Sequence, residues 1–209
     1  MIFPCKFRHW CILAWVAAFT LIQTDIAGAT LRFKVDPDRS VITFRVRELG
    51  ITWVRGKFRP VSGHIILEDD SSRLTEIDIR VRVAGVDTGN MERDRYLKGP
   101  EFFHSDAFPW IRFKSSSIDR IDRHQFRIRG DLSFHGITRR IQIEATQTGA
   151  QADSKWERRS VFHTVFTVRR SEYGMKPIMG GLGDKVELTV NVAGTHKKLF
   201  LTPPVFDDK

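Results

Sequence analysis

The stretch Leu74–Val83, LTEIDIRVRV, alternates between apolar and charged residues with a period of two. From Ile77 to Val83 every odd position is Ile or Val, and from Asp78 to Arg82 every even position is charged. Successive side chains of a β-strand point to opposite faces. This stretch therefore predicts a strand with one buried face and one solvated face.

The same pattern recurs on both sides of this stretch. In Ser40–Leu49, SVITFRVREL, the residues Ile42, Phe44 and Val46 share one face, and continuing the alternation places Glu48 on that apolar face. About eight long strands joined by short turns predict an all-β chain, either an antiparallel barrel or a sandwich. The other predicted strands are 31–35, 53–58, 63–67, 110–118, 125–134, 138–148, 160–169 and 186–193, and 149–155 is predicted to be a polar loop.

The segment Thr88–Ser115, TGNMERDRYLKGPEFFHSDAFPWIRFKS, interrupts the run of strands. A short helical insertion is predicted near residues 89–105, because Thr88 or Asn90 can accept hydrogen bonds from the first free N–H groups and Gly99-Pro100 stops the helix. A dense run of aromatic residues follows the helix. These rings either plug a core or line an apolar cavity.

Residues 1–29 predict a cleaved signal peptide. Lys6 and Arg8 precede an apolar run, and Ala27-Gly28-Ala29 offers small residues for cleavage after Ala29. Both cysteines of the chain lie in this segment, so the exported protein must be stabilised by its apolar core without disulfides. No composition shift suggests a second domain, and we expect one domain over residues 30–198 with a flexible tail over 199–209.

The chain is strongly basic, with a formal net charge of +9. Export argues against nucleic acid as the partner. The charge predicts either a soluble basic surface or attraction to anionic lipid head groups or phosphates.

Phenylalanine dominates the aromatic residues, with 16 Phe against 2 Tyr. A cavity lined by Phe, Leu, Ile and Val, with few hydroxyl groups, suits a hydrocarbon ligand. The alternative is that these rings fill a solid core.

Four residues are the candidates for acid–base catalysis: Glu48, Arg93, Asp94 and His135. A salt bridge or a loop latch explains Arg93 and Asp94 more simply. No spacing of histidines predicts a metal site, and no Ser/His/Asp order suggests hydrolysis. Residues 175–183, MKPIMGGLG, are interpreted as an adaptable apolar rim.

Four blocks, in order along about residues 31–195, resemble those of the YceI-like, or polyisoprenoid-binding, family of exported bacterial proteins. The blocks are SVITF (40–44) with VRGKF (54–58); the spaced residues Thr88, Arg93, Asp94, Leu97, Phe102, Phe103, Phe108, Pro109, Phe113, Lys114 and Ser115; GDLSFHGIT (130–138); and RSEYGM (170–175) with GDKV (183–186).

The resemblance implies an extended, lipocalin-like antiparallel β-barrel in the periplasm. Its lumen would hold a long isoprenoid chain, such as a quinone tail or a polyprenyl lipid, without catalytic residues, cofactor or metal. The expected partner is an isoprenoid or other long-chain amphipathic lipid, and no nucleic acid; transient contact with a membrane surface and a homodimer are left open. The function is then binding, carriage or storage of the lipid. The alternatives are an exported enzyme acting on a lipid-like substrate and an interaction module with a basic surface.

The chain departs from the family at Glu48, where many members have a His before Leu-Gly. A buried carboxylate needs a partner, so Glu48 either pairs with a cation or lies at the wet mouth. The helical turn Asn90–Lys98 should cap or flank one mouth, with Arg93 and Asp94 as its latch. From alternation and the family blocks, the predicted ligand-binding residues are Phe44, Val46, Glu48, Trp53, Phe58, Met91, Leu97, Phe102, Phe103, Phe108, Trp110, Phe113, Leu132, Phe134, Met175, Ile178 and Leu182.

Overall fold

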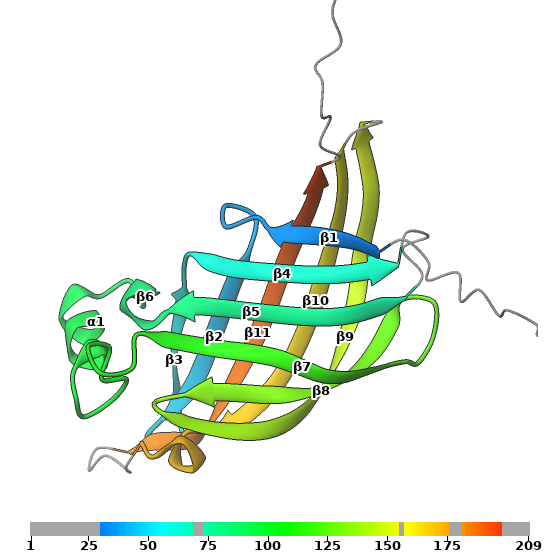
Figure 1. Cartoon of the computed structure of the whole chain (residues 1–209). Helices are drawn as coiled ribbons and strands as arrows, with labels where there is room; N and C mark the ends of the chain where they lie inside the picture. Colours follow the sequence, from blue (N-terminus) through cyan, green and yellow to red (C-terminus); the bar gives the residue numbers. More distant parts are fainter. Residues whose placement is uncertain (1–29, 69–72, 155–156, 176–180, 198–209) are drawn as a thin grey trace, which may run out of the picture.

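The computed structural model describes residues 30–68, 73–154, 157–175 and 181–197 (Figure 1). The predicted signal peptide and the predicted tail lie outside these residues, so both stay predictions. The elements are β1 (Thr30–Val35), β2 (Val41–Glu48), β3 (Thr52–Phe58), β4 (Val61–Glu68), β5 (Leu74–Arg82), η1 (Val83–Gly85), β6 (Val86–Asp87), α1 (Met91–Lys98), β7 (Trp110–Arg120), β8 (Gln125–Phe134), β9 (Ile137–Ser154), β10 (Glu157–Arg169), η2 (Arg170–Tyr173) and β11 (Leu182–Lys197).

Eight antiparallel strands close into a barrel in the order β1-β4-β5-β7-β8-β9-β10-β11. The ring closes where β1 returns to β11, with Lys34 opposite Thr195 and Val35 opposite Gly194. Closure encloses the faces that carry the apolar residues. The predicted all-β, lipocalin-like barrel is therefore confirmed.

Three further strands extend the wall along the other half of β11. β2 pairs with β11 from Leu182 to Asn191, β3 pairs with β2, and the short β6 pairs with the end of β3. Ser40 marks the exchange between β1 and β2, because its hydroxyl accepts a hydrogen bond from the Ala193 N–H at 3.0 Å. The β2–β3 hairpin thus forms the wall at one end of the barrel.

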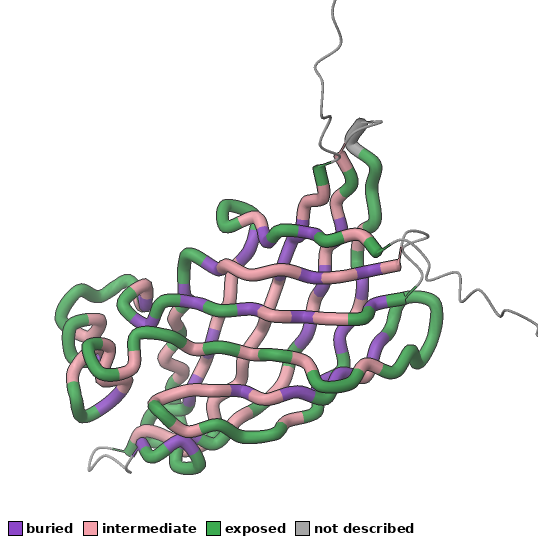
Figure 2. Tube along the Cα trace, in the orientation of Figure 1, coloured by how far each residue is buried: buried purple, intermediate pink, exposed green. Residues whose placement is uncertain are grey.

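The period-two pattern places the apolar side chains inside. Along most strands in Figure 2, buried positions alternate with exposed or half-buried ones. Phe44 and Val46 of β2 are buried, whereas Arg47 of the same strand is exposed. Burying such apolar side chains stabilises the fold by about 1.5–3 kcal/mol each, which suits a chain whose described residues contain no cysteine.

One loop prediction was wrong. Residues 149–154 belong to β9, which continues to pair with β10 as far as Ser154. Their Gly, Gln and Ala content resembles a loop, but the backbone ladder needs no apolar side chains. A register shift between Val161 and Phe162 of β10 lets the pairing continue past Gly149.

The predicted helical insertion is confirmed as α1. Its N-terminus is capped by Asn90, whose side-chain oxygen accepts a hydrogen bond from the Arg93 N–H at 3.0 Å. Gly99 ends the helix, and Leu97 is its buried residue. No helix in the described ranges is long and apolar enough to cross a bilayer.

Candidate ligand-binding site

The barrel interior contains an apolar cavity of about 130 Å³, whose lining includes Arg170 of η2 and residues of the β2–β3 hairpin. Side chains from seven strands line it, together with side chains from α1 and the segment after it and from η2 and the segment after it. The lining residues are Ile42, Phe44, Val46, Phe58, Val81, Leu97, Phe102, Phe103, Ile111, Phe113, Leu132, Phe134, Phe166, Val168, Arg170, Met175, Leu182, Val186, Leu188 and Val190.

A second apolar cavity, of about 70 Å³, lies deeper in the barrel. Phe113, Phe166 and Val190 line both cavities, so these three side chains lie between them.

A chain of aromatic rings crosses the first cavity. Ring centroids are 5.3 Å apart for Phe44 and Phe58, 5.6 Å for Phe58 and Phe103, and 5.5 Å for Phe103 and Phe134. Gly56 makes room for the first ring, because a Cβ at Gly56 would collide with the ring of Phe44. These tilted contacts hold the rings by packing without polar partners.

A hydrogen-bonded latch fixes the segment that brings Phe102 and Phe103 to the cavity. Asp94 accepts from the Thr88 N–H at 2.9 Å and from the Thr88 hydroxyl at 2.6 Å. Arg93 donates from Nε to that hydroxyl and from Nη2 to the Thr88 carbonyl, at 2.9 and 3.0 Å. The predicted latch by Arg93 and Asp94 is confirmed, and both residues act through Thr88.

Arg170 is the charged residue of the cavity wall and is only 5% exposed. Its Nε donates to the Gly183 carbonyl and its Nη2 to the Leu182 carbonyl, at 3.0 and 3.1 Å. Burial lowers the pKa of Arg170 from its usual value, and the nearby carboxylate of Asp184 opposes that shift. The guanidinium therefore joins η2 to the start of β11 while its stem faces the cavity.

The structure brings eleven of the predicted ligand-binding residues together around the first cavity. Whether these residues bind a ligand stays a prediction. The eleven are Phe44, Val46, Phe58, Leu97, Phe102, Phe103, Phe113, Leu132, Phe134, Met175 and Leu182.

Two predicted lumen residues, Trp53 and Trp110, lie on the outside of the barrel. Trp53 has the guanidinium carbons of Arg45 and Arg47 each 4.6 Å from its ring centroid. Trp110 is 39% exposed and lies 4.7 Å from the guanidinium carbon of Arg82. Expecting them inside was wrong, since stacking on cations stabilises both rings in contact with water.

Three more predicted residues do not line the cavity. Met91 is 85% exposed at the start of α1, and Glu48 is exposed at the end of β2, which corresponds to the wet-mouth alternative. Phe108 packs instead against the β8–β9 turn, with its ring centroid 4.9 Å from that of His135. Ile178 lies outside the described residues.

Nine lining residues escaped the sequence analysis. Most of them follow the alternation of strands already predicted, as Ile111 does beside Phe113 and Phe166 does beside Val168. The predicted site consists mainly of aromatic residues, although the alternation applies equally to these residues, most of which are aliphatic. Arg170 had no such signal. The nine are Ile42, Val81, Ile111, Phe166, Val168, Arg170, Val186, Leu188 and Val190.

The candidates for acid–base catalysis lie in separate places. His135 Nδ1 donates to the Tyr173 carbonyl at 3.0 Å, and Glu48 is exposed on the hairpin. Arg93 and Asp94 are engaged by Thr88. Within the described ranges no hydrogen bond or ion pair joins these three places, and no group of three His, Cys, Asp or Glu residues could hold a metal ion.

The Tyr173 side chain is 1% exposed, and its hydroxyl has no hydrogen-bond partner among the described residues. Burial, with the Glu172 carboxylate adding to it, raises the pKa of Tyr173 to about 12. A neutral phenol packed against Phe134, with centroids 5.8 Å apart, is part of the core beside the cavity.

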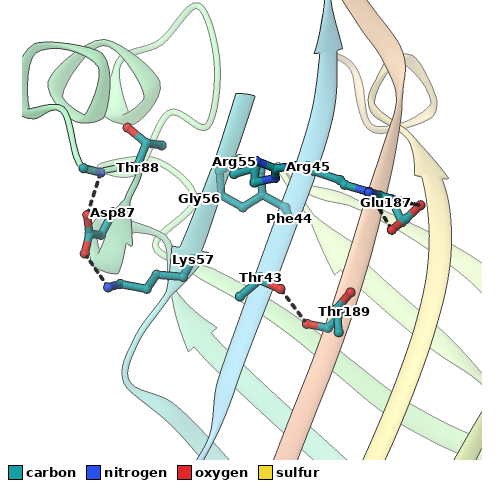
Figure 3. A pocket seen from close by; sticks show the side chains of 11 residues that line it. Thr43, Phe44, Arg45, Arg55, Gly56, Lys57, Asp87, Thr88, Glu187 and Thr189 are labelled. Atoms are coloured by element: carbon teal, nitrogen blue, oxygen red, sulfur yellow. Dashed lines mark hydrogen bonds and ion pairs between the residues drawn. The ribbon is translucent and has the colours of Figure 1, made fainter. Parts of the chain in front are cut away.

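An open groove of about 650 Å³ lies over β2, β3 and β11 (Figure 3). Its charged side chains are largely paired with one another: Arg45 donates to Glu187 at 2.9 Å, and the Lys57 ammonium is 3.0 Å from Asp87. Such exposed pairs contribute little net free energy, as expected of a solvated surface. The enclosed apolar cavity in the interior is therefore the better candidate for a ligand-binding site.

Comparisons with known proteins agree with this architecture. The family model described as the YceI-like domain matches residues 33–194. Protein YceI of Shigella flexneri is 26% identical over 169 residues, covering 79% of this chain and 87% of the relative.

Solved structures show the same fold. BcnA from Burkholderia cenocepacia superposes with a TM-score of 0.66 at 16% identity, covering 76% of this chain and 98% of BcnA. A polyisoprenoid binding domain from Saccharophagus degradans, implicated in plant cell wall breakdown, superposes with a TM-score of 0.60 at 12% identity, covering 80% of this chain and 99% of that domain.

Proposed function

The chain belongs to the YceI-like family, and we propose that it binds and carries or stores a long-chain isoprenoid lipid in its barrel lumen. The observation that carries this proposal is the pair of apolar cavities in one lumen, separated by Phe113, Phe166 and Val190. The polyisoprenoid binding reported for the Saccharophagus domain supports the same ligand class. We place the protein in the periplasm on the basis of its predicted signal peptide.

Burial of the hydrocarbon chain would drive binding. Each CH₂ group removed from water contributes about 0.8 kcal/mol, so several isoprene units would outweigh the cost of ordering the chain. The cavities of about 130 and 70 Å³ are smaller than the ~300–1,000 Å³ of ordinary ligand pockets. We therefore expect the rings of Phe113 and Phe166 to move aside when the lipid enters.

Among the described residues, the lumen walls carry no set of groups suited to catalysis, which supports the proposal of a carrier over that of an enzyme. The charged residue of the wall, Arg170, is occupied by the carbonyls of Leu182 and Gly183. A lipid head group would then remain at the mouth, and the apolar chain would fill the lumen.

Native mass spectrometry and lipid extraction of the purified protein test this function. We expect a co-purified lipid with a long hydrocarbon chain, and saturable binding of a quinone or polyprenol to the stripped protein. Phe103→Asp should cut lipid content at least about tenfold, because a carboxylate in an apolar lumen is costly to desolvate.

Thr167→Asp is the matched control, since Thr167 is an exposed residue next to the lining residue Phe166 on β10. It adds the same charge to the outside and should leave lipid content unchanged. Wild-type protein that neither co-purifies with lipid nor binds these lipids on titration would contradict the function. Unchanged lipid content in folded Phe103→Asp would remove Phe103 from the site.

A further inference from the structure

The tip of the β2–β3 hairpin exposes two large apolar side chains. Leu49 is 67% exposed and Ile51 is 80% exposed. The turn closes through a hydrogen bond from the Ile51 N–H to the Glu48 carbonyl at 3.1 Å. Hairpin tips are usually built from Gly, Asn, Asp and other polar residues, so an exposed Leu-Gly-Ile turn is unusual.

Leu49 also adopts a backbone conformation that disfavours its side chain. Its φ is +52°, in the left-handed region that Gly and Asn occupy readily and bulky residues rarely do. Folding alone would favour Asn at this position. A strained and solvent-exposed Leu is therefore better explained by a contact made outside the barrel.

The hairpin tip lies at the rim of the lumen. The Leu49 N–H donates to the Gly181 carbonyl at 2.8 Å, and Leu182, the next residue, lines the cavity and pairs with Glu48. Whatever the tip contacts is consequently brought close to the mouth through which a ligand would pass.

A basic face lies directly behind the tip on four neighbouring strands, β3, β2, β11 and β10. Their outward positions over residues 53–57, 43–47, 185–189 and 165–169 carry six cations and one acid, Glu187. Three further acids flank this face: Glu48 at the tip, Asp184 at the start of β11, and Asp87 on β6. Glu187 and Asp87 pair with Arg45 and Lys57, which leaves a net excess of cations. The six cations are Arg45, Arg47, Arg55, Lys57, Arg169 and Lys185.

Trp53 and Arg47 connect this basic face to the tip. The Arg47 guanidinium donates to the Gly50 carbonyl at 2.9 Å and stacks on Trp53 at 4.6 Å. From the tip backwards, the surface therefore carries exposed apolar residues, then a Trp, then cations. A membrane surface offers matching partners for these residues: the acyl boundary for apolar side chains, the interface for Trp, and the phosphates for cations.

We propose that the β2–β3 hairpin tip docks the lumen end of the barrel onto an anionic phospholipid membrane. Leu49 and Ile51 insert at the acyl boundary, Trp53 lies at the interface, and the basic face contacts the phosphates. Two apolar side chains with a few cations give a weak, reversible contact, which suits a carrier that must leave the membrane. The observations for docking do not depend on the proposed function; only the role of docking in lipid carriage rests on it.

Flotation with vesicles of phosphatidylcholine, with and without phosphatidylglycerol, tests docking on the whole protein. We expect binding that requires phosphatidylglycerol and weakens as salt rises. Leu49→Asn and Ile51→Thr should each weaken binding about tenfold. Arg55→Gln should weaken it about fivefold, and only on vesicles that contain phosphatidylglycerol.

Leu49→Asn separates binding from folding. Because Asn tolerates positive φ, this variant should unfold at the same urea concentration as wild type or a higher one. Ile121→Thr is the matched control, since Ile121 is 42% exposed in the β7–β8 turn, in a different hairpin from the tip, and its loss should leave vesicle binding unchanged.

Wild-type protein that fails to float with phosphatidylglycerol vesicles would overturn the proposal, as would wild-type binding by folded Leu49→Asn and Ile51→Thr. A dimer that both variants abolish would assign the tip to a second copy of the chain and overturn it too. Lipid content measured on the same preparations keeps the tests separate: docking without a bound lipid refutes the carrier function alone, and a loaded lumen without docking refutes only this proposal.

Discussion

The inner and outer faces of β2 and β3 hold aromatic side chains in opposite ways. Inside, the rings of Phe44 and Phe58 pack against each other with centroids 5.3 Å apart and are buried. Outside, Trp53 lies between Arg45 and Arg47, each 4.6 Å from its ring. The same arrangement recurs at Trp110, which stacks with Arg80 and Arg82 at 5.3 and 4.7 Å.

The difference follows from the chemistry of the two rings. Phe has no polar atom and can be buried without a hydrogen-bond partner. Trp has a broader ring that attracts cations and an N–H that favours contact with water. The inner face should therefore depend on packing, whereas the outer face should depend on exposed cation–π contacts and ion pairs that are individually weak.

The largest expected effect is on the inner face. Phe44→Ala should lower the free energy of unfolding by about 3–5 kcal/mol, because it leaves a cavity beside Phe58. Trp53→Ala on the neighbouring strand removes a larger side chain but should cost only about 1 kcal/mol, since its two cation–π contacts are exposed to solvent. Urea denaturation at neutral pH measures both variants.

Each variant is the control for the other, because both remove one aromatic ring, from the inner and from the outer face respectively. An equal loss of stability in Phe44→Ala and Trp53→Ala would break the comparison and show that the outer stack is part of the folding core. A smaller loss in Phe44→Ala than in Trp53→Ala would reverse it.

The sequence contained the signal that distinguishes the two faces. Trp53 is two and four residues from Arg55 and Lys57, and Trp110 is two and four residues from Arg112 and Lys114. Because residues two apart on a strand share a face, this parity places both Trp side chains on the charged outer face. The predictions that placed both Trp side chains inside, made from their aromatic identity, were therefore wrong. The strands, the barrel and most of the cavity wall, in contrast, follow from parity and the family blocks.

Other features had no local signal in the sequence. Arg170 is buried because η2 folds its side chain against the first carbonyls of β11, a contact between segments twelve or more residues apart. The strand over 149–154 depends on pairing with β10 and not on its own composition. Such tertiary contacts decide positions that propensity alone leaves ambiguous.

Arginine gives a second test of the two faces. Arg170→Met should lower the free energy of unfolding by about 1.5–3 kcal/mol, because the carbonyls of Leu182 and Gly183 lose charge-assisted hydrogen bonds in a buried place. Arg47→Met, on the outer face, should cost no more than about 1 kcal/mol. Both changes keep an unbranched apolar stem, and thermal or urea unfolding compares them.

If the two Arg variants lose the same stability, the difference between the inner and outer faces would hold for aromatic residues alone. If Arg170→Met is as stable as wild type, desolvation of the guanidinium offsets its hydrogen bonds, and the buried charge serves something other than stability. Arg170→Lys should recover only part of any loss, since one ammonium cannot reproduce the two-nitrogen contact.

The smallest expected effect is an ion pair on the outer face, between Asp78 of β5 and Arg112 of β7. Arg112 Nε donates to Asp78 Oδ1 at 3.0 Å, and this hydrogen bond lowers the pKa of Asp78 below its usual value. A carboxyl group whose folded pKa is depressed stabilises the fold above its unfolded pKa of about 3.9, and the contribution is lost as pH falls through the folded value. Because the Arg112 side chain is 50% exposed, solvent screening limits the gain at neutral pH to about 0.2–1 kcal/mol.

Asp78→Asn should therefore be slightly less stable than wild type at pH 7, and the difference should shrink as pH falls below about 4. Urea denaturation across this range measures it, and added salt should reduce the difference at pH 7. Arg112→Gln, which removes the other partner, should show the same trend. A difference that persists unchanged in acid would mean that Asp78→Asn acts through packing, and a loss as large as that of Phe44→Ala would show that the outer face stabilises the barrel as strongly as the inner one.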